Sequence, residues 1–152
     1  RDWSSDVCSS DLLDGSTMRR GLNRDLGFSA SDRSENLRRS METAKIVNDD
    51  GLICIAAFVA PQESTRTKAA ELIGEDRFLV VHCAAPLDHC RTKDPTGLYA
   101  EAESRGLTDL PGIDFDYEAP TNADLVLPTH ELEMEESINR ILELLRTRDV
   151  LR

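Results

Sequence analysis

The sequence has no long apolar run and few features of membrane, secreted or redox proteins. No stretch approaches the roughly 18 consecutive apolar residues that a bilayer-spanning helix needs, and no signal peptide opens the chain. Its four cysteines form no CxxC pair. Two of them, Cys54 and Cys83, lie in apolar runs, where small buried thiols are common. We therefore expect reduced thiols and a cytoplasmic protein.

Basic residues are scarce for the size of the chain. Lys plus Arg number 18 against 29 Asp plus Glu in 152 residues, which gives a formal charge of −11. Nucleic acids and anionic membranes repel such a chain at long range, so we expect neither as a partner. With 39% hydrophobic residues, the length suits one domain with an ordinary core.

Three common motifs of catalysis and nucleotide binding do not occur in the sequence. There is no GxSxG, no GxGxxG and no GxxxxGK[ST], the loop that cradles phosphates. His82, Cys83, His89 and Cys90 form two HC pairs seven residues apart. This spacing matches no zinc pattern, and a buried strand followed by a helix accounts for it. We therefore assign no metal ligands.

The first twelve residues, RDWSSDVCSSDL, differ from the rest of the chain in composition. They hold the only Trp and show neither helical nor strand periodicity. The whole string matches the in-frame translation of a common sequencing-library adapter, and a natural disordered Ser/Asp leader is the alternative. We therefore expect an artefact or leader at residues 1–12 and a domain at 13–152 that begins in the middle of a fold.

Apolar runs and helical patterns alternate along the remaining chain. The periodicity predicts helices at 29–50, 62–73, 86–93 and 131–148, and strands at 52–60, 78–84 and 124–127. The first two strands lack polar alternation, which is typical of central strands covered on both faces. The segment 94–121 is rich in Gly, Pro and Asp, with a helical pattern at 98–104, and is long enough to be a lid. The order predicts an α/β fold with helices on both faces of a parallel sheet.

One segment of this acidic chain is locally basic. Seven basic residues there outnumber four acidic ones: Arg19, Arg20, Arg24, Arg33, Arg38, Arg39 and Lys45 against Asp25, Asp32, Glu35 and Glu42. Because the planar guanidinium suits oxyanions, the segment predicts a site for a small phosphorylated or sulfated anion. For Arg19 and Arg33 we favour the site. For Arg38 and Arg39, a solvated helix face with a Glu35–Arg39 ion pair is an equal alternative.

Six motifs, in order and spacing, resemble the adenylyl-sulfate kinase family: LDGSTMRRGLNRDLGFS, SDRSENLRR, FVAP, DPTGLY, GID and YEAP. The resemblance spans about residues 13–145 and is strongest to the kinase domain that some bacteria carry fused to a sulfate adenylyltransferase. It implies a P-loop kinase-like three-layer fold with a parallel sheet, lacking here its first strand, phosphate loop and first helix. It also implies phosphorylation of the 3′-hydroxyl of adenylyl sulfate, giving 3′-phosphoadenylyl sulfate in sulfate assimilation, with ATP and Mg²⁺ in the full-length parent.

The resemblance, carried over position by position, implies roles for individual residues. Asp14 is implied as the catalytic carboxylate near the attacking hydroxyl. The implied substrate-binding residues are Arg19, Arg33 and Asn36 at the phosphosulfate, Phe28 on the adenine, Val59 and Ala60 along the substrate, and Leu110 in the adenine clamp. The implied lid begins with Lys93, Asp94, Thr96, Gly97, Leu98 and Tyr99.

Several positions depart from the family pattern. Ser16 and Thr17 replace the second Asp and the Asn of the family's DGDN element, Leu110 replaces an aromatic, and Thr96, Ala100, Glu101 and Glu103 stand where Lys and Arg are usual. Since the phosphate loop is missing as well, we expect negligible phosphate transfer by these 152 residues. The alternatives are a non-catalytic module that binds a nucleotide or packs against a fused sulfate adenylyltransferase, and a kinase for another small acceptor. The sequence leaves the oligomeric state open, a homodimer included.

Overall fold

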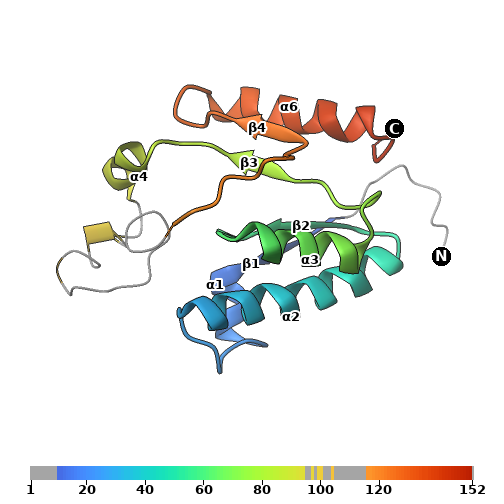
Figure 1. The fold of residues 1–152 in the computed structure, drawn as a ribbon. Coiled ribbons are helices and arrows are strands. Elements are labelled where there is room, and N and C mark those ends of the chain that lie inside the picture. The colour runs from blue at the N-terminus through green and yellow to red at the C-terminus, as the bar shows by residue number, and fades with distance from the viewer. Residues whose placement is uncertain (1–9, 95–96, 98, 101–103, 105–115, 152) are drawn as a thin grey trace. The chain divides into compact units, whose positions relative to one another are not determined.

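The computed structural model describes residues 10–94, 97, 99–100, 104 and 116–151. The chain divides into two compact units, Arg1–Phe78 and Leu79–Arg152. Each unit contains one pair of parallel strands together with helices, as Figure 1 shows. No helix in the described ranges is both long enough and apolar enough to cross a membrane.

The first unit contains the strands and helices that carry the basic segment. They are β1 (Ser10–Asp14), α1 (Gly15–Arg20), α2 (Ala30–Asp49), β2 (Ile53–Ala57) and α3 (Glu63–Ile73). β1 and β2 run parallel, with Ser10 opposite Ile53 and Asp14 opposite Ala57. Parallel strands need a long crossover, and α1 and α2 lie within it. The carboxyl ends of β1 and β2 therefore lie side by side, and the residues that follow each strand begin at the same edge.

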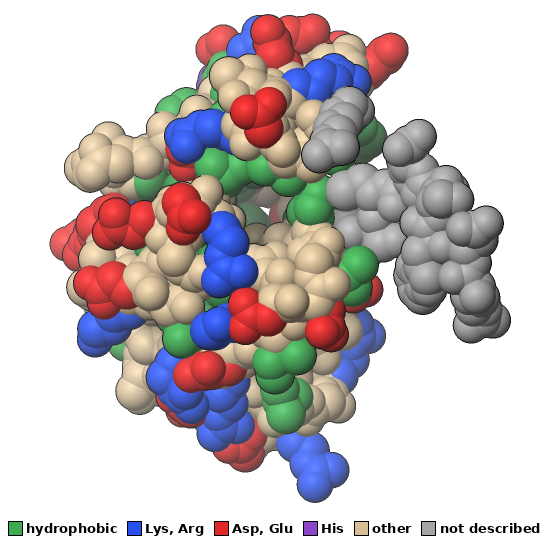
Figure 2. Space-filling model, turned by 90° about the vertical axis from the view of Figure 1, so that its right-hand side faces the viewer, with side chains coloured by type: hydrophobic (Ala, Val, Ile, Leu, Met, Phe, Trp, Pro, Cys, Tyr) green, Lys and Arg blue, Asp and Glu red, His purple; other side chains and the backbone are tan. Residues whose placement is uncertain are grey.

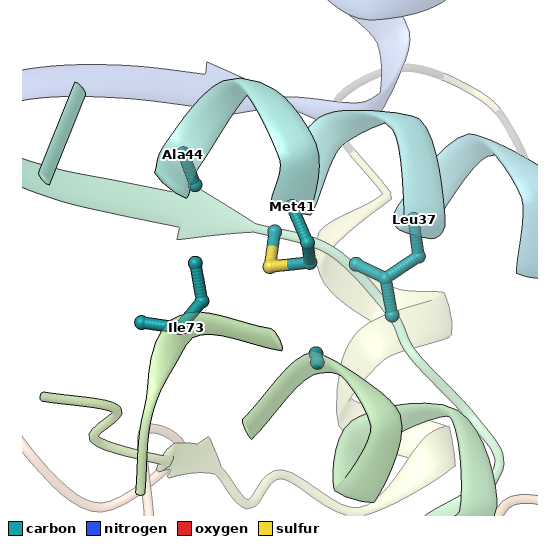
Figure 3. Packing of buried hydrophobic residues seen from close by; sticks show 5 residues of the cluster. Leu37, Met41, Ala44 and Ile73 are labelled. Carbon is teal, nitrogen blue, oxygen red and sulfur yellow. The ribbon is translucent and has the colours of Figure 1, made fainter. Parts of the chain in front are cut away.

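The core of the first unit lies between α2 and α3. Leu37, Met41 and Ala44 recur every three or four residues along α2, so they share one face of the helix, and all three are buried. Ala69 and Ile73 of α3 complete the cluster, and Figure 3 shows the side chains of Leu37, Met41 and Ala44 directed toward the α3 side. Burying side chains such as Leu37 and Met41 stabilises the unit by about 1.5–3 kcal/mol each. This packing fixes α2, the helix that carries Arg33 and Asn36.

The second unit contains β3 (Val81–Cys83), α4 (Leu87–Lys93), β4 (Leu125–Leu127) and α6 (Met134–Thr147). β3 and β4 run parallel, with Val81 opposite Leu125 and Cys83 opposite Leu127. Asp124 joins the parts of the unit, because Oδ2 accepts from the Val80 N–H at 2.8 Å and Oδ1 accepts from the Arg148 guanidinium just after α6. One carboxylate therefore links the backbone just before β3 to the residue just after α6.

The four predicted helices are confirmed, with boundaries shifted by up to three residues. The prediction of central strands covered on both faces is wrong for the described residues. In the described part of the chain β2 pairs with β1 alone, and Ile55 is 53% exposed. Cys83 in β3 is also exposed. An apolar run indicates that a strand can be buried. Whether it is buried depends on the strands beside it and the helices that cover its faces.

The sequence pattern missed β1 and α1. β1 begins at Ser10, so residues 10–12 of the predicted leader pair with β2, and the boundary expected at residue 13 is three residues too late for the sheet. Parallel pairing uses backbone N–H and C=O groups, which do not depend on the side chains. Residues 10–14 therefore form a strand although their sequence shows no periodic pattern. The origin of the first twelve residues stays a prediction.

Candidate functional site

Asp14 lies at the carboxyl end of β1 and caps α1. Its Oδ1 accepts hydrogen bonds from the Ser16 N–H at 3.0 Å and the Thr17 N–H at 2.9 Å. The bond from Thr17, followed by that from Ser16, lowers the pKa of Asp14 from its ordinary value against the opposing effect of partial burial. The side chain is therefore an ionised carboxylate at neutral pH, fixed at the end of the strand by the helix that it starts.

Two guanidinium groups lie close to the ring of Phe28. The Cζ atom of Arg19 lies 4.6 Å from the ring centroid and that of Arg33 lies 5.4 Å from it, both within the range of a cation–π contact. Arg19 comes from α1 and Arg33 from the first turns of α2. Phe28 lies in the loop between these helices and is 60% exposed, so its ring is accessible to a planar ligand.

Backbone carbonyls hold both arginines in place. Arg19 Nε donates to Gly27 O at 3.0 Å and Nη1 to Gly15 O at 3.3 Å, while Arg33 Nε donates to Phe28 O at 2.8 Å. Partial burial lowers the pKa of Arg19 from its ordinary value, and a guanidinium still stays charged at neutral pH. The result is a cluster of two cations and one ring, which we call the Arg19–Phe28–Arg33 cluster.

Local turn chemistry explains why the loop adopts this shape. Ser29 caps α2, since its Oγ accepts from the Asp32 N–H at 3.2 Å. The carboxylate of Asp32 reaches back to the Gly27 N–H at 3.2 Å. A Cβ atom at Gly27 would lie 3.1 Å from Asp32 Oδ2, so the glycine permits the close approach. These contacts place Phe28 at the start of α2, beside Arg33.

The arginines that the sequence left undecided are engaged in ion pairs. Arg38 bonds Glu35 at 2.7 Å, and Arg39 bonds both Glu35 and Asp25 at 2.8 Å. These bonds, with that from Arg38 the largest, lower the pKa of Glu35 to about 2. The solvated helix face is therefore the better interpretation for Arg38 and Arg39. On the face that Figure 2 displays, basic side chains likewise lie among acidic ones.

Val59 and Ala60 follow β2 at the same edge as Asp14. Val59 is 55% exposed, and Ala60 has a positive φ of 38°, a conformation that costs a non-glycine residue energy. The ring of Phe58 packs against the start of α1, because a Cβ atom at Gly15 would lie 3.3 Å from Phe58 Cδ1. The segment after β2 therefore lies against the segment after β1. The contact of Val59 and Ala60 with a substrate stays a prediction.

Asn36 lies one turn after Arg33 on α2 and is only 2% exposed. Its Oδ1 accepts from Asn23 Nδ2 at 2.8 Å. Asn23, which the sequence analysis did not single out, is fully buried. An asparagine in a short Gly-containing turn is ordinarily a turn residue, so nothing in the sequence marks Asn23 as a contact of Asn36.

The described part of the predicted lid forms a capped turn within the second unit. Asp94 Oδ2 accepts from the backbone N–H groups of Tyr99 and Ala100 at 2.9 and 3.2 Å, and Gly97 adopts a positive φ of 70° between them. Burial, together with the nearby Cys90, raises the pKa of Tyr99. Lys93 ends α4. Thr96, Leu98 and Leu110 lie outside the described residues.

The histidines of the two HC pairs make ring contacts in the second unit. His82 stacks on Tyr117 with centroids 6.0 Å apart, and His89 meets His130 edge-on at 6.0 Å. A hollow of about 380 Å³ is lined by His82, Ala84, Ala85, Pro86, Tyr117, Ala119 and His130. In the described ranges, no three or more His, Cys, Asp or Glu side chains are grouped to hold a metal ion.

Comparison with known proteins gives consistent similarities. The family model for adenylylsulphate kinase matches residues 3–128, so the match begins inside the predicted leader. The bifunctional enzyme CysN/CysC of Rhodopirellula baltica is 49% identical over 141 residues, which are 93% of this chain but 22% of that protein. The adenylyl-sulfate kinase of Shewanella amazonensis is 44% identical over 134 residues, covering 88% of this chain and 68% of its own length.

Solved structures show the same likeness. The structure of the Mycobacterium tuberculosis APS kinase CysC in complex with AMPPNP and APS has a TM-score of 0.85 and 36% identity, and the match covers 92% of this chain and 81% of that one. A hexameric APS kinase from Thiobacillus denitrificans matches with a TM-score of 0.68 at 29% identity, covering 95% of this chain and 24% of that chain. These matches confirm the predicted α/β fold of the P-loop kinase type.

Proposed function

This chain belongs to the adenylylsulphate kinase family, and from that membership we propose that it serves ATP-dependent phosphorylation of the 3′-hydroxyl of adenylyl sulfate. The product would be 3′-phosphoadenylyl sulfate, formed in sulfate assimilation in the cytoplasm. The observation that carries the proposal within the chain is the Arg19–Phe28–Arg33 cluster.

The cluster suits a nucleotide that carries an acidic group. An exposed phenyl ring offers a stacking surface for a nucleobase, and guanidinium groups bind phosphate and sulfate oxygens in a planar fork. Each charge-assisted hydrogen bond to such an anion contributes about 1.5–3 kcal/mol. Since Arg19 and Arg33 are anchored on backbone carbonyls through Nε, little side-chain entropy is lost when the ligand binds.

We propose that Asp14 orients the acceptor hydroxyl. A carboxylate with a lowered pKa is a weak base, so its contribution lies in holding the hydroxyl proton in a hydrogen bond rather than in removing it early. Phosphoryl transfer depends mainly on positioning and electrostatics, and this role agrees with that requirement. Val59 and Ala60, at the same edge of the sheet, would contact the acceptor.

The residues at the end of β1 could hold a magnesium ion through one carboxylate. Mg²⁺ is commonly held by one or two carboxylates together with water and substrate phosphates, and Asp14 supplies one at the end of β1. Ser16 cannot supply a second. When bound, the ion would neutralise charge on the transferred phosphate.

The remaining parts of the proposal concern the nucleotide. Among the 152 printed residues there is no GxxxxGK[ST] loop, and we propose that phosphate transfer is negligible until such a loop is supplied. The lid residues Lys93, Asp94, Thr96, Gly97, Leu98 and Tyr99, with Leu110, would close over the bound nucleotides and exclude water.

A second candidate function is a non-catalytic module joined to a sulfate adenylyltransferase. Ser16 favours it, because serine cannot replace a carboxylate that assists the hydroxyl or a metal-bound water. The likeness to a bifunctional enzyme adds weight. Such a module would bind adenylyl sulfate without turning it over.

One experiment separates the two functions. The chain is expressed with the corresponding N-terminal segment of the Shewanella amazonensis relative in place of residues 1–9, and ADP release is followed with and without adenylyl sulfate. Release that depends on adenylyl sulfate supports the kinase. Binding of adenylyl sulfate by calorimetry without ADP release supports the non-catalytic module, and absence of both contradicts the proposal.

A further inference from the structure

Two buried asparagine side chains meet next to the site, one helical turn from Arg33. Asn23 is 0% exposed and Asn36 is 2% exposed. Asn23 Nδ2 donates to Asn36 Oδ1 at 2.8 Å and also to the backbone oxygen of Asn36 at 3.3 Å. Ser40, one turn further along α2, donates its hydroxyl to the same backbone oxygen at 2.7 Å.

These contacts determine which end of each amide faces the other. A backbone carbonyl only accepts hydrogen bonds, so the Asn23 atom that faces Asn36 O must be the nitrogen. The Asn36 side-chain atom that faces this nitrogen at 2.8 Å must then be the oxygen. Both amide orientations follow from the hydrogen-bond network and not from the shape of the side chains.

The NH₂ group of Asn36 is therefore turned away from Asn23. In the described part of the chain no group accepts a hydrogen bond from Asn36 Nδ2. Because Asn36 follows Arg33 by three residues on α2, the two side chains share a helix face. Asn36 can thus present two N–H donors on the side where Arg33 binds an anion. In the reversed orientation it would present an oxygen, which repels an anion.

We propose that Asn23 is a positioning residue that fixes the Asn36 amide as a donor toward the phosphosulfate of adenylyl sulfate. The identity of the anion rests on the proposed function. Asn23 Oδ1 is buried and finds no hydrogen-bond partner among the residues that the structure describes, which destabilises the fold. What this side chain contributes is therefore the pair of bonds from its NH₂ group. The inference adds to the site a residue that needs no contact with substrate.

A double-mutant cycle on the 152-residue chain tests the inference. Adenylyl sulfate affinity is measured by calorimetry for Asn23→Ala, Asn36→Ala and the double variant. We expect each single variant to bind about tenfold more weakly, as for loss of one hydrogen bond to a charged group. The double variant should bind no more weakly than Asn36→Ala, because Asn23 acts through Asn36. Additive losses, or an unchanged affinity of Asn23→Ala, would overturn the inference.

Ser40→Ala provides the matched control. Ser40 is as buried as Asn23 and bonds the same backbone oxygen; the hydrogen bond that its hydroxyl donates goes to this backbone oxygen and not to the side-chain amide. Its removal should lower stability in urea unfolding while leaving the affinity within about twofold. An equal loss of affinity in Ser40→Ala would assign Asn23 a merely structural role. If Asn23→Ala does not fold, Asn23→Leu replaces it, since leucine keeps nearly the same shape, removes the NH₂ group and buries no charge.

A second measurement does not depend on the substrate. Side-chain amide exchange by NMR should show slow exchange for the Asn23 NH₂ group and faster exchange for that of Asn36. A failure of the wild-type chain to bind adenylyl sulfate would contradict the proposed function alone, and the exchange pattern would then decide the positioning inference. The reverse pattern would overturn it.

Discussion

The Cζ atom of Arg33 lies 5.4 Å from the centre of the Phe28 ring while its Nε donates to the backbone oxygen of Phe28 at 2.8 Å. One residue thus provides both a surface for the guanidinium and the carbonyl that anchors it. Arg19 approaches the same ring from α1. The short loop between α1 and α2 therefore determines where the two guanidinium groups lie. They form a local positive charge in a chain of net charge −11.

Arg33→Ala should weaken binding of adenylyl sulfate by about tenfold or more, because a charge-assisted bond to the anion is lost. Arg38→Ala is the matched control on the same helix, since its guanidinium is paired with Glu35, and its affinity should not change. Calorimetry with the 152-residue chain measures both. ATP affinity is measured with and without the Arg33→Ala substitution in the chain that carries the N-terminal segment of the relative, and it should stay nearly constant. Equal losses of affinity for adenylyl sulfate and for ATP would assign Arg33 a structural role.

Phe28→Leu should reduce the affinity for adenylyl sulfate while leaving the fold intact. Stacking of a base on an aromatic side chain contributes about 1–3 kcal/mol, which leucine cannot replace. Because Phe28 is 60% exposed, its removal leaves no large cavity. Ile46→Ala, at another exposed apolar position on α2, is the control. A Phe28→Leu variant that binds as tightly as wild type would show that the ring does not contact the base.

The order and type of most helices could be predicted from the sequence, whereas the arrangement of the site could not. The α2 stripe of Leu37, Met41 and Ala44 and the Ser29 cap are local signals, so α2 was found within one residue at each end. β1 was missed because its first residues show no periodic pattern of apolar and polar side chains. Arg38 pairs with Glu35 on its own helix, whereas Arg39 also pairs with Asp25, fourteen residues earlier in the chain. No sequence pattern indicates a pairing between a helix and a loop residue over that distance.

The contact of Asn23 with Asn36 also could not be predicted from the sequence. Its role comes from a hydrogen bond to a side chain thirteen residues later, and the residue types alone do not specify it. The resemblance to a family supplied Arg19, Phe28, Arg33 and Asn36 because each lies in a motif of fixed spacing. It could not supply a residue whose function is to orient another.

Glu35 predicts a pH dependence of stability. The bonds from Arg38 and Arg39 lower its pKa from 4.5 to about 2 in the folded chain. The stability that this ion pair contributes is therefore complete above the unfolded value of 4.5 and is lost as the pH falls through about 2. Urea unfolding between about pH 5 and pH 2 should show a shallower loss of stability in Glu35→Gln than in wild type. Glu42→Gln, whose carboxylate has a single 3.4 Å bond to Arg38, should keep most of the wild-type slope, and identical slopes in all three chains would contradict the assignment.

Asp14 caps α1, and one pair of substitutions can separate this observed role from the proposed role at the acceptor hydroxyl. Asparagine caps helices about as well as aspartate, so Asp14→Asn should retain the bonds to Ser16 and Thr17 and leave thermal stability nearly unchanged. It removes the negative charge that would orient the hydroxyl and hold Mg²⁺. In the chain that carries the N-terminal segment of the relative, turnover should therefore fall by about 10²-fold, the loss expected when a reacting group is no longer held in position. Asp14→Ala should lose the same activity and in addition about 1 kcal/mol of stability. If Asp14→Asn keeps full turnover, the carboxylate acts only as a helix cap, and the hydroxyl must be oriented by another group.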